Sequence, residues 1–247
     1  MKRFLIALQF LTTLPIKIKS EIKNEDFGKS LLYFPIVGML IGLLLSLILS
    51  LFNFLPHLVL GVFILLASFI ITGGIHLDGF ADTCDGFYGS KPKKKILEIM
   101  RDSRVGTMGV TGLVCLLLLK FALIVNTPKD MLWKLLIMMT AFARLSQVLA
   151  CYTSGYARQE GKAKYFIEYA LKKDAVIGAL FTLSLFLWLM QIKGVALFLI
   201  PIPLIFLFIN YIKKRINGMT GDTIGAVSEL AEVSILLSFL VINRLYI

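Results

Sequence analysis

The chain has few charged residues. Asp, Glu, Lys and Arg make up 17% of its 247 residues, whereas about 25% is usual for a soluble protein. Hydrophobic residues make up 58%, and they are concentrated in long blocks. A membrane-spanning helix needs about 20 consecutive apolar residues, and its backbone satisfies its own hydrogen bonds in lipid. The composition therefore argues against a soluble domain and predicts one integral membrane domain over residues 1–247.

The chain also lacks the arrangements that many metal and nucleophilic sites need. Its three cysteines, Cys84, Cys115 and Cys151, are far apart and form no CxxC pair, which argues against a disulfide framework or a zinc site. No HExxH motif, Walker loop or Ser-His-Asp arrangement is present. The net charge of +11 indicates anionic partners. Because no aromatic and basic segment stands out, membrane lipid is favoured over nucleic acid.

Seven apolar blocks predict an all-α fold, a polytopic membrane bundle of about seven transmembrane helices. The blocks are residues 30–55, 58–75, 105–125, 131–152, 175–190, 195–211 and 223–242. Residues 1–16 begin like a signal peptide, with Lys2 and Arg3 before an apolar run, but they lack a cleavage site and the run ends at Pro15. They predict an uncleaved N-terminal helix that is interfacial or half-buried in the membrane.

The basic residues are distributed unevenly between the blocks. Residues 1–29, 76–104, 153–174 and 211–222 together hold 20 of the 26 Lys and Arg residues. Seven crossings place these segments on one side, which the positive-inside rule makes cytoplasmic. We therefore expect a protein of the cytoplasmic (inner) membrane with an external C-terminus. Of the 15 acidic residues only Asp130 falls on the external side, which the positive-inside rule does not require.

Three aspartates follow the second block at helical spacing. Asp78, Asp82 and Asp85 stand at positions i, i+4 and i+7, so they share one face if the segment is helical. Carboxylates this close repel one another unless a cation lies between them, and Mg²⁺ bridges carboxylates and phosphate oxygens. We therefore expect these aspartates to be metal ligands. The alternative is a solvated helix start with incidental acids. His76, just before them, is expected to bind substrate rather than metal.

Further polar residues flank the third and last blocks. Arg101 and Arg104 lie on about one helical face and are suited to clamp phosphates, although flanking positive charge alone would also explain them. Thr220 and Asp222 precede the last block. Capping the last helix is the simplest role for Asp222. Completing the metal shell or accepting a proton is the functional alternative, with Thr220 as a substrate-binding residue.

Ionisable residues also occur inside the blocks, where they are costly and usually face the bundle interior. Glu229 and Glu232 lie in the last block, and Glu229 is expected to be a further metal ligand. Arg144 lies in the fourth block and is expected to bind a phosphate or, equally, to form a structural ion pair. Arg158 follows that block and is expected to bind substrate. The residues alone therefore predict a cytoplasmic metal site for a substrate that carries phosphate or diphosphate.

Five short motifs run in order through nearly the whole chain. They are Phe10-Leu-Thr-Thr-Leu-Pro15, Phe34-Pro-Ile-Val-Gly38, His76-Leu-Asp-Gly-Phe-Ala-Asp-Thr-Cys-Asp-Gly86, Glu98-Ile-Met-Arg-Asp-Ser-Arg-Val-Gly106 and Thr220-Gly-Asp-Thr-Ile-Gly-Ala226. In these motifs the chain resembles the cobalamin synthase family, also called adenosylcobinamide-GDP ribazoletransferases. Phe80 and Cys84 stand where small or aliphatic residues are expected.

The resemblance implies a membrane transferase that joins adenosylcobinamide-GDP to α-ribazole, or to its 5′-phosphate, and releases GMP with Mg²⁺ as cofactor. Asp78, Asp82 and Asp85 would then hold Mg²⁺ against the diphosphate. Asp82, Asp222 and Arg104 are the expected catalytic residues. The expected partners are the two substrates and membrane lipid, without nucleic acid; a homo-oligomer is left open.

Three other functions are weighed against this one. Asp78-Gly-Phe-Ala-Asp82 is similar to the opening of the CDP-alcohol phosphotransferase motif, but Asp82 replaces an arginine and the downstream spacing differs. A prenyltransferase would need a second Asp-rich motif, and the segment around Asp222 has one Asp. A transporter is least favoured, because the external loops are too short and too poor in polar residues to build a second gate.

Overall fold

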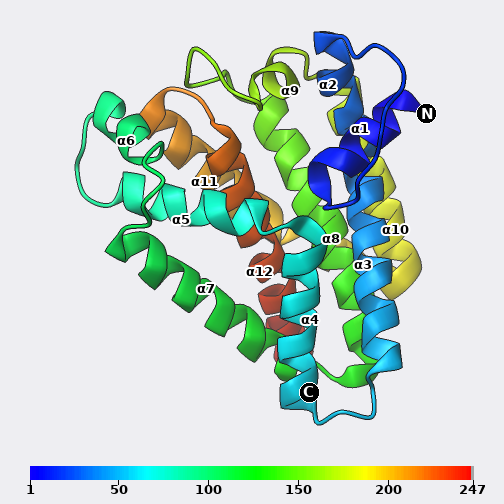
Figure 1. Cartoon of the computed structure of the whole chain (residues 1–247). Coiled ribbons are helices and arrows are strands. Elements are labelled where there is room, and N and C mark those ends of the chain that lie inside the picture. Colours follow the sequence, from blue (N-terminus) through cyan, green and yellow to red (C-terminus); the bar gives the residue numbers. More distant parts are fainter. Residues whose placement is uncertain (246–247) are drawn as a thin grey trace.

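The computed structural model describes residues 1–245, and within them every regular element is a helix. The elements are α1 (Lys2–Leu11), α2 (Asn24–Ser30), the 3-10 turn η1 (Leu31–Tyr33), α3 (Phe34–Leu51), α4 (His57–Thr72), α5 (Ile75–Phe87), α6 (Lys93–Ile99), α7 (Thr107–Val125), α8 (Lys129–Tyr152), α9 (Lys164–Glu168), α10 (Lys172–Leu199), α11 (Pro201–Ile216) and α12 (Gly221–Leu245). The predicted all-α fold is confirmed (Figure 1).

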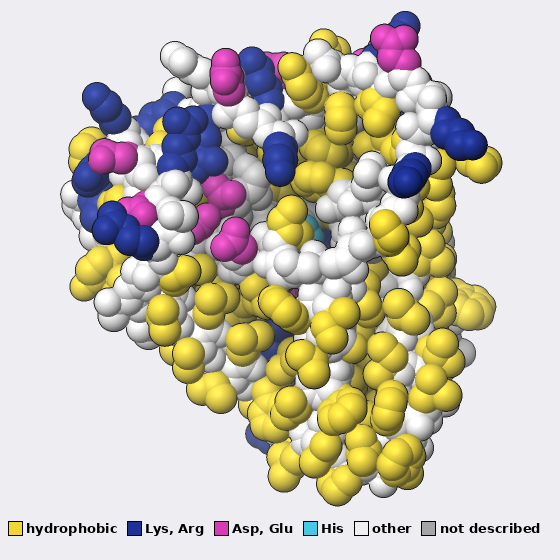
Figure 2. All heavy atoms as spheres, viewed as in Figure 1, with side chains coloured by type: hydrophobic (Ala, Val, Ile, Leu, Met, Phe, Trp, Pro, Cys, Tyr) yellow, Lys and Arg dark blue, Asp and Glu magenta, His cyan; other side chains and the backbone are white. Residues whose placement is uncertain are grey.

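Five helical segments are long and apolar enough to cross a membrane, and a bent pair made of α4 and α5 would raise the number to six. The five are Asn24–Leu51, Thr107–Val125, Lys129–Tyr152, Lys172–Ile216 and Gly221–Arg244. Large apolar side chains on their outer faces are exposed, for example Leu47, Leu118, Leu180 and Leu207. Figure 2 shows a broad apolar surface below a polar cap. These features are those of an integral membrane bundle.

The longest of these segments, Lys172–Ile216, is folded back on itself. Gln191 has non-helical backbone angles, with φ 51° and ψ −137°. The rings of Phe186 and Phe198 have centroids 5.8 Å apart, whereas a straight helix would separate these residues by about 18 Å. The segment therefore consists of two arms that meet at Gln191. The break predicted between the apolar blocks 175–190 and 195–211 is confirmed, since this segment holds both blocks and bends between them.

A sharp turn separates α4 from α5. Gly73 and Gly74 both have left-handed backbone angles (φ 63° and 67°), which glycine adopts without steric cost. The two helices therefore meet at 93°. At 13 residues α5 is about 20 Å long, too short to cross a membrane by itself, and it runs crosswise to α4 and over the start of α12 (Figure 1). The acidic segment thus forms a helix, which is the condition for its aspartates to share one face, and this helix turns away from the direction of α4.

The N-terminal helix α1 covers part of the same end of the bundle. Its ten residues are too few to cross a membrane, and Ile6, Ala7 and Leu11 are buried against the bundle. After α1, the backbone N–H of Thr13 donates a hydrogen bond to the carbonyl oxygen of Ile71 (2.8 Å), which ties the segment to the end of α4. The prediction of a short N-terminal helix that does not cross is confirmed.

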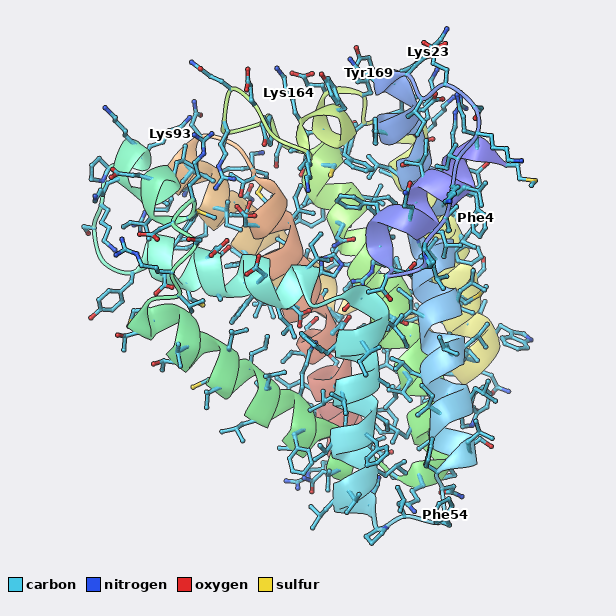
Figure 3. All side chains as sticks on the ribbon, in the orientation of Figure 1. Phe4, Lys23, Phe54, Lys93, Lys164 and Tyr169 are labelled. Atoms are coloured by element: carbon cyan, nitrogen blue, oxygen red, sulfur yellow. The ribbon has the colours of Figure 1, made fainter. Side chains whose placement is uncertain are left out.

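The segments predicted to share one side do gather at one end of the molecule, which we call the polar face. Figure 1 shows α1, α2, α6 and α9 at this end and the last turns of α12 at the other. Lys23, Lys93 and Lys164 point outward from the polar face, and Phe54 lies at the opposite end (Figure 3). The counting of basic residues therefore predicted correctly which segments lie together.

Helix α8 forms the centre of the bundle. It is surrounded by α3, α10 and α12, and its apolar and polar residues alike are buried along most of its length, including Arg144 and Gln147. Gly38 and Gly42 of α3 let that helix approach closely, because a side chain at either position would overlap the α8 backbone. Polar residues of α8 are thus held inside the bundle beneath the polar face.

Candidate active site

The first group of site residues lies where α5 crosses the start of α12. A side chain at Gly79 would place its Cβ 2.6 Å from the carbonyl oxygen of Asp222, so only glycine permits this approach. The approach brings Asp222 alongside Asp78 and Asp82. The negative charges of Asp222 and Asp78 both act on the Asp82 carboxyl. Two motifs far apart in the sequence therefore form one acidic group.

The start of α12 is capped by threonine rather than by aspartate. The Thr220 hydroxyl accepts a hydrogen bond from the Thr223 backbone N–H (3.2 Å), and the Thr223 hydroxyl accepts one from the Thr220 backbone N–H (2.8 Å). The simplest role expected for Asp222 is therefore wrong. Its Oδ2 lies 3.0 Å from Nη2 of Arg158 instead. Thr220 itself is fully buried and serves the cap.

Asp85 is held by the first turn of α7. Its two carboxylate oxygens accept hydrogen bonds from the backbone N–H groups of Gly106 (2.7 Å) and Gly109 (2.8 Å). A side chain at either glycine would overlap the Asp85 carboxylate. A helix N-terminus attracts a carboxylate in this way. Each oxygen retains a second lone pair, so Asp85 is fixed in orientation and still able to accept another ligand.

The acidic group lacks compensating positive charge on α5 itself. In residues 1–245, no Lys, Arg or His forms an ion pair with Asp78 or Asp82, although the charge of Arg158 acts on Asp82 from nearby. Burial, together with the carboxylates of Asp222 and Asp78, raises the pKa of Asp82 to about 7, because each disfavours a further negative charge. A cation placed among these carboxylates would relieve the repulsion.

The carboxylates do not by themselves form a complete metal-coordination site. Among the described residues, no group of three or more His, Cys, Asp or Glu side chains is arranged to hold one ion. An all-oxygen donor set of this kind still suits Mg²⁺, which usually takes one or two carboxylates and completes its shell with water and substrate phosphate. The residues therefore fit a metal that arrives with a phosphate-bearing substrate.

A cavity of about 260 Å³ opens beside the acidic group. Its mouth is lined by Asp78, Arg158, Lys162 and Asp222, and its floor by His76 and Gln147. Its apolar wall is formed by Phe10, Phe34 and Phe166, from three separate helices. His76 thus lies in a cavity, as expected of a substrate-binding residue. The apolar wall and Gln147 were not predicted.

The predicted arginines occupy different positions around the mouth. Arg158 reaches from the segment after α8, and its Nη2 donates to the carbonyl oxygen of Met100 (3.4 Å). This contact brings the loop that carries Arg101 and Arg104 toward the cavity. Both side chains are exposed, and Arg104 pairs with Asp102 of its own turn at 2.7 Å.

Two predicted residues lie apart from the acidic group, in a buried ionic network. The Lys120 ammonium group contacts Glu229 (2.5 Å) and Glu232 (2.6 Å). Arg144 donates to the Ser228 hydroxyl at 2.5 Å and lies 3.8 Å from Glu232. The structure does not bring Glu229 to the aspartates, since seven residues of helix separate it from Asp222 by about 10 Å. The structural ion pair considered for Arg144 is present.

Lys120 and Gln147 are the residues that the sequence interpretation left unassigned. Lys120 is a single lysine in the middle of an apolar block, and such a residue needs a buried counter-ion. Gln147 follows Arg144 by three residues and therefore shares its helix face. The sequence therefore shows that both residues are unusual for their positions, but the residues that they contact lie on other helices.

The family model described as cobalamin-5-phosphate synthase matches residues 3–240. Proteins named adenosylcobinamide-GDP ribazoletransferase are similar over nearly the full length. The relative from Clostridium acetobutylicum is 36% identical and covers 96% of this chain and 95% of its own. The relative from Alkaliphilus metalliredigens is 39% identical and covers 98% and 96%. No solved structure matches.

These matches favour the resemblance over the CDP-alcohol phosphotransferase, prenyltransferase and transporter alternatives, because they extend across all the site segments described above. They also agree with the apolar helices, which make the chain an integral membrane protein. The chain belongs to the cobalamin-5-phosphate synthase family and is a transferase of cobalamin synthesis.

Proposed function

We propose that the chain transfers the corrinoid phosphoryl group of adenosylcobinamide-GDP to a ribose hydroxyl of α-ribazole, or of its 5′-phosphate, with Mg²⁺ as cofactor. A bond forms between the ribose oxygen and the corrinoid-linked phosphorus, the diphosphate bond to GMP breaks, and the hydroxyl proton is released. The names of the relatives support the substrate. The observation that carries the proposal is the group of carboxylates from α5 and α12 beside a cavity whose mouth also carries Arg158 and Lys162.

The carboxylates of α5 are the proposed metal ligands. Asp78 and Asp82 are free of ion pairs within the described residues, and Asp85 is oriented by two backbone amides. Asp222 stands across the helix crossing as a further candidate. When bound, Mg²⁺ supplies positive charge that offsets the negative charge of the diphosphate. Glu229 is omitted from this set because Lys120 occupies its carboxylate.

The proposed roles of Asp222, Arg101 and Arg104 follow from where these residues lie around the cavity mouth. Asp222 lies at the cavity mouth and can accept the proton of an attacking hydroxyl, and Arg158 holds its carboxylate in place at 3.0 Å. Arg101 and Arg104 stand on the exposed loop near the mouth and can bind phosphate oxygens of the diphosphate or of the departing GMP. Arg104 would have to exchange Asp102 for phosphate, a small cost for an exposed pair.

The membrane orientation belongs to the same proposal. The polar face carries the four basic segments and therefore faces the cytoplasm under the positive-inside rule. The C-terminus would then lie outside, because α12 runs from the polar face to the opposite end. Residues 246–247 lie outside the described part of the chain. Cytoplasmic nucleotide substrates would reach the site without crossing the membrane.

The test is direct. Purified protein in lipid nanodiscs is incubated with adenosylcobinamide-GDP, α-ribazole and Mg²⁺, and GMP is measured by chromatography. The expected result is GMP release that requires all three components, stops with excess EDTA and returns with added Mg²⁺. GMP release without α-ribazole would indicate hydrolysis instead of transfer. Undiminished transfer in EDTA would reject the metal assignment.

A further inference from the structure

The cavity beside the acidic group changes in character with depth. At the mouth, Asp78 and Lys162 are exposed, and Asp222 is partly exposed. At the floor, His76 is 5% exposed and Gln147 is 1% exposed. The mouth is therefore charged and exposed, whereas the interior is buried. A ligand that fills this cavity needs one apolar part and one polar part.

The floor holds a hydrogen-bonding group without a partner. Oε1 of Gln147 is buried and makes no hydrogen bond, while its Nε2 lies 3.3 Å from Nδ1 of His76. A buried amide oxygen left unpaired is costly. Because the amide can turn over, it can present either a donor or an acceptor to a ligand. The polar floor is thus suited to one or two hydrogen bonds with a heterocycle.

The wall suits a flat aromatic ring. The ring centroid of Phe166 lies 4.5 Å from that of Phe10 and 5.6 Å from that of Phe34. Phe34 and Phe166 are each 2% exposed, and Phe10 closes the cavity from α1. Clustered phenyl rings favour stacked or edge-on contact with a further aromatic ring.

The mouth suits the sugar end of the same molecule. Nε of Arg158 is buried and makes no hydrogen bond, although its Nη2 pairs with Asp222. Lys162 supplies a second cation. A ribose hydroxyl, or a 5′-phosphate, can accept from Arg158 Nε. The base and the sugar of one nucleoside would therefore have separate hydrogen-bonding partners in the cavity, Gln147 for the base and Arg158 for the sugar.

The size of the cavity decides between the two substrates of the proposed function. Its volume of about 260 Å³ lies just below the range of about 300–1,000 Å³ usual for small-molecule sites. It can take a single nucleoside but not a corrin macrocycle. We propose that α-ribazole enters this cavity base first, with its base at Gln147 and its ribose at Arg158 and Asp222. The corrinoid nucleotide then lies outside, along the exposed face of α5.

This inference rests on the proposed function for the identity of the nucleoside, and two measurements keep them separable. The first is equilibrium dialysis of α-ribazole against the full-length protein in nanodiscs, without the second substrate. We expect Gln147→Leu, which removes the amide at nearly constant volume, to weaken binding about ten-fold or more. Thr140→Val is the matched control, since it also removes a buried polar group of α8 but lies outside the cavity.

The second measurement is the KM for each substrate in GMP release. Gln147→Leu should raise the KM for α-ribazole about ten-fold and leave the KM for adenosylcobinamide-GDP unchanged. In the unmodified protein, with excess EDTA present so that no transfer occurs, adenosylcobinamide-GDP should not displace α-ribazole. This competition needs no variant. Displacement, or unchanged α-ribazole binding in a folded Gln147→Leu protein, would overturn the inference. Absence of GMP release in the unmodified protein would instead reject the proposed function, whatever the dialysis shows.

Discussion

The crossing of α5 and α12 gives the sharpest test of the site. Gly79 has no side chain at the point where α5 meets the backbone of Asp222. In Gly79→Ala the added Cβ would lie 2.6 Å from the Asp222 carbonyl oxygen and 2.7 Å from its Cα, and neither atom can rotate away. The two helices must therefore move apart, and Asp222 must move away from Asp78 and Asp82.

The size of the effect follows from these distances. Ordinary contact begins at 3.4 Å, so the helices must separate by about 0.8 Å. Alanine is better than glycine inside a helix by about 1 kcal/mol, while overpacking costs about 1–3 kcal/mol. The net loss of stability should therefore be small. A displacement of about 1 Å among reacting groups can cost about 100-fold in rate, and we expect a loss of turnover of this order.

The assay is GMP release from adenosylcobinamide-GDP and α-ribazole, with the thermal unfolding midpoint measured on the same preparation. Gly155→Ala is the matched control, because a Cβ there meets no atom within 4 Å and the residue does not have a positive φ. The control should keep its activity. A folded Gly79→Ala protein with activity near that of the unmodified chain would refute the claim that the crossing positions the carboxylates.

Three further outcomes are expected. Asp82→Ala should abolish GMP release while the protein still inserts into the membrane and folds. The control Asp130→Ala, at the opposite end of the molecule, should remain active. An active Asp82→Ala variant would reject the assignment of Asp82 as a metal ligand. Lys120→Met removes the ammonium group 2.5 Å from Glu229 and 2.6 Å from Glu232, so it should cost about 3–5 kcal/mol of stability. Adding Glu229→Gln should recover part of that loss, and an unchanged unfolding midpoint in Lys120→Met would contradict the network. A reporter fused to the C-terminus should be active only outside the cytoplasm, and cytoplasmic activity would reverse the topology.

The sequence by itself determined the fold class and the polar face. Long apolar blocks can satisfy their backbone hydrogen bonds in lipid only as helices, so the helices followed directly. The short connection at Gln191 and the shared end of the four basic segments were also predicted correctly. The spacing of Asp78, Asp82 and Asp85 placed them on one helix face, because that depends only on the helical repeat.

The tertiary structure alone decided which of these polar groups meet. Helix periodicity says which face a residue occupies but not which helix crosses that face. The absence of a side chain at Gly79 brings Asp222 to α5, and the first turn of α7 fixes Asp85. Glu229 pairs with Lys120 of α7, because a buried charge needs a partner, and this partner lies far away in the sequence.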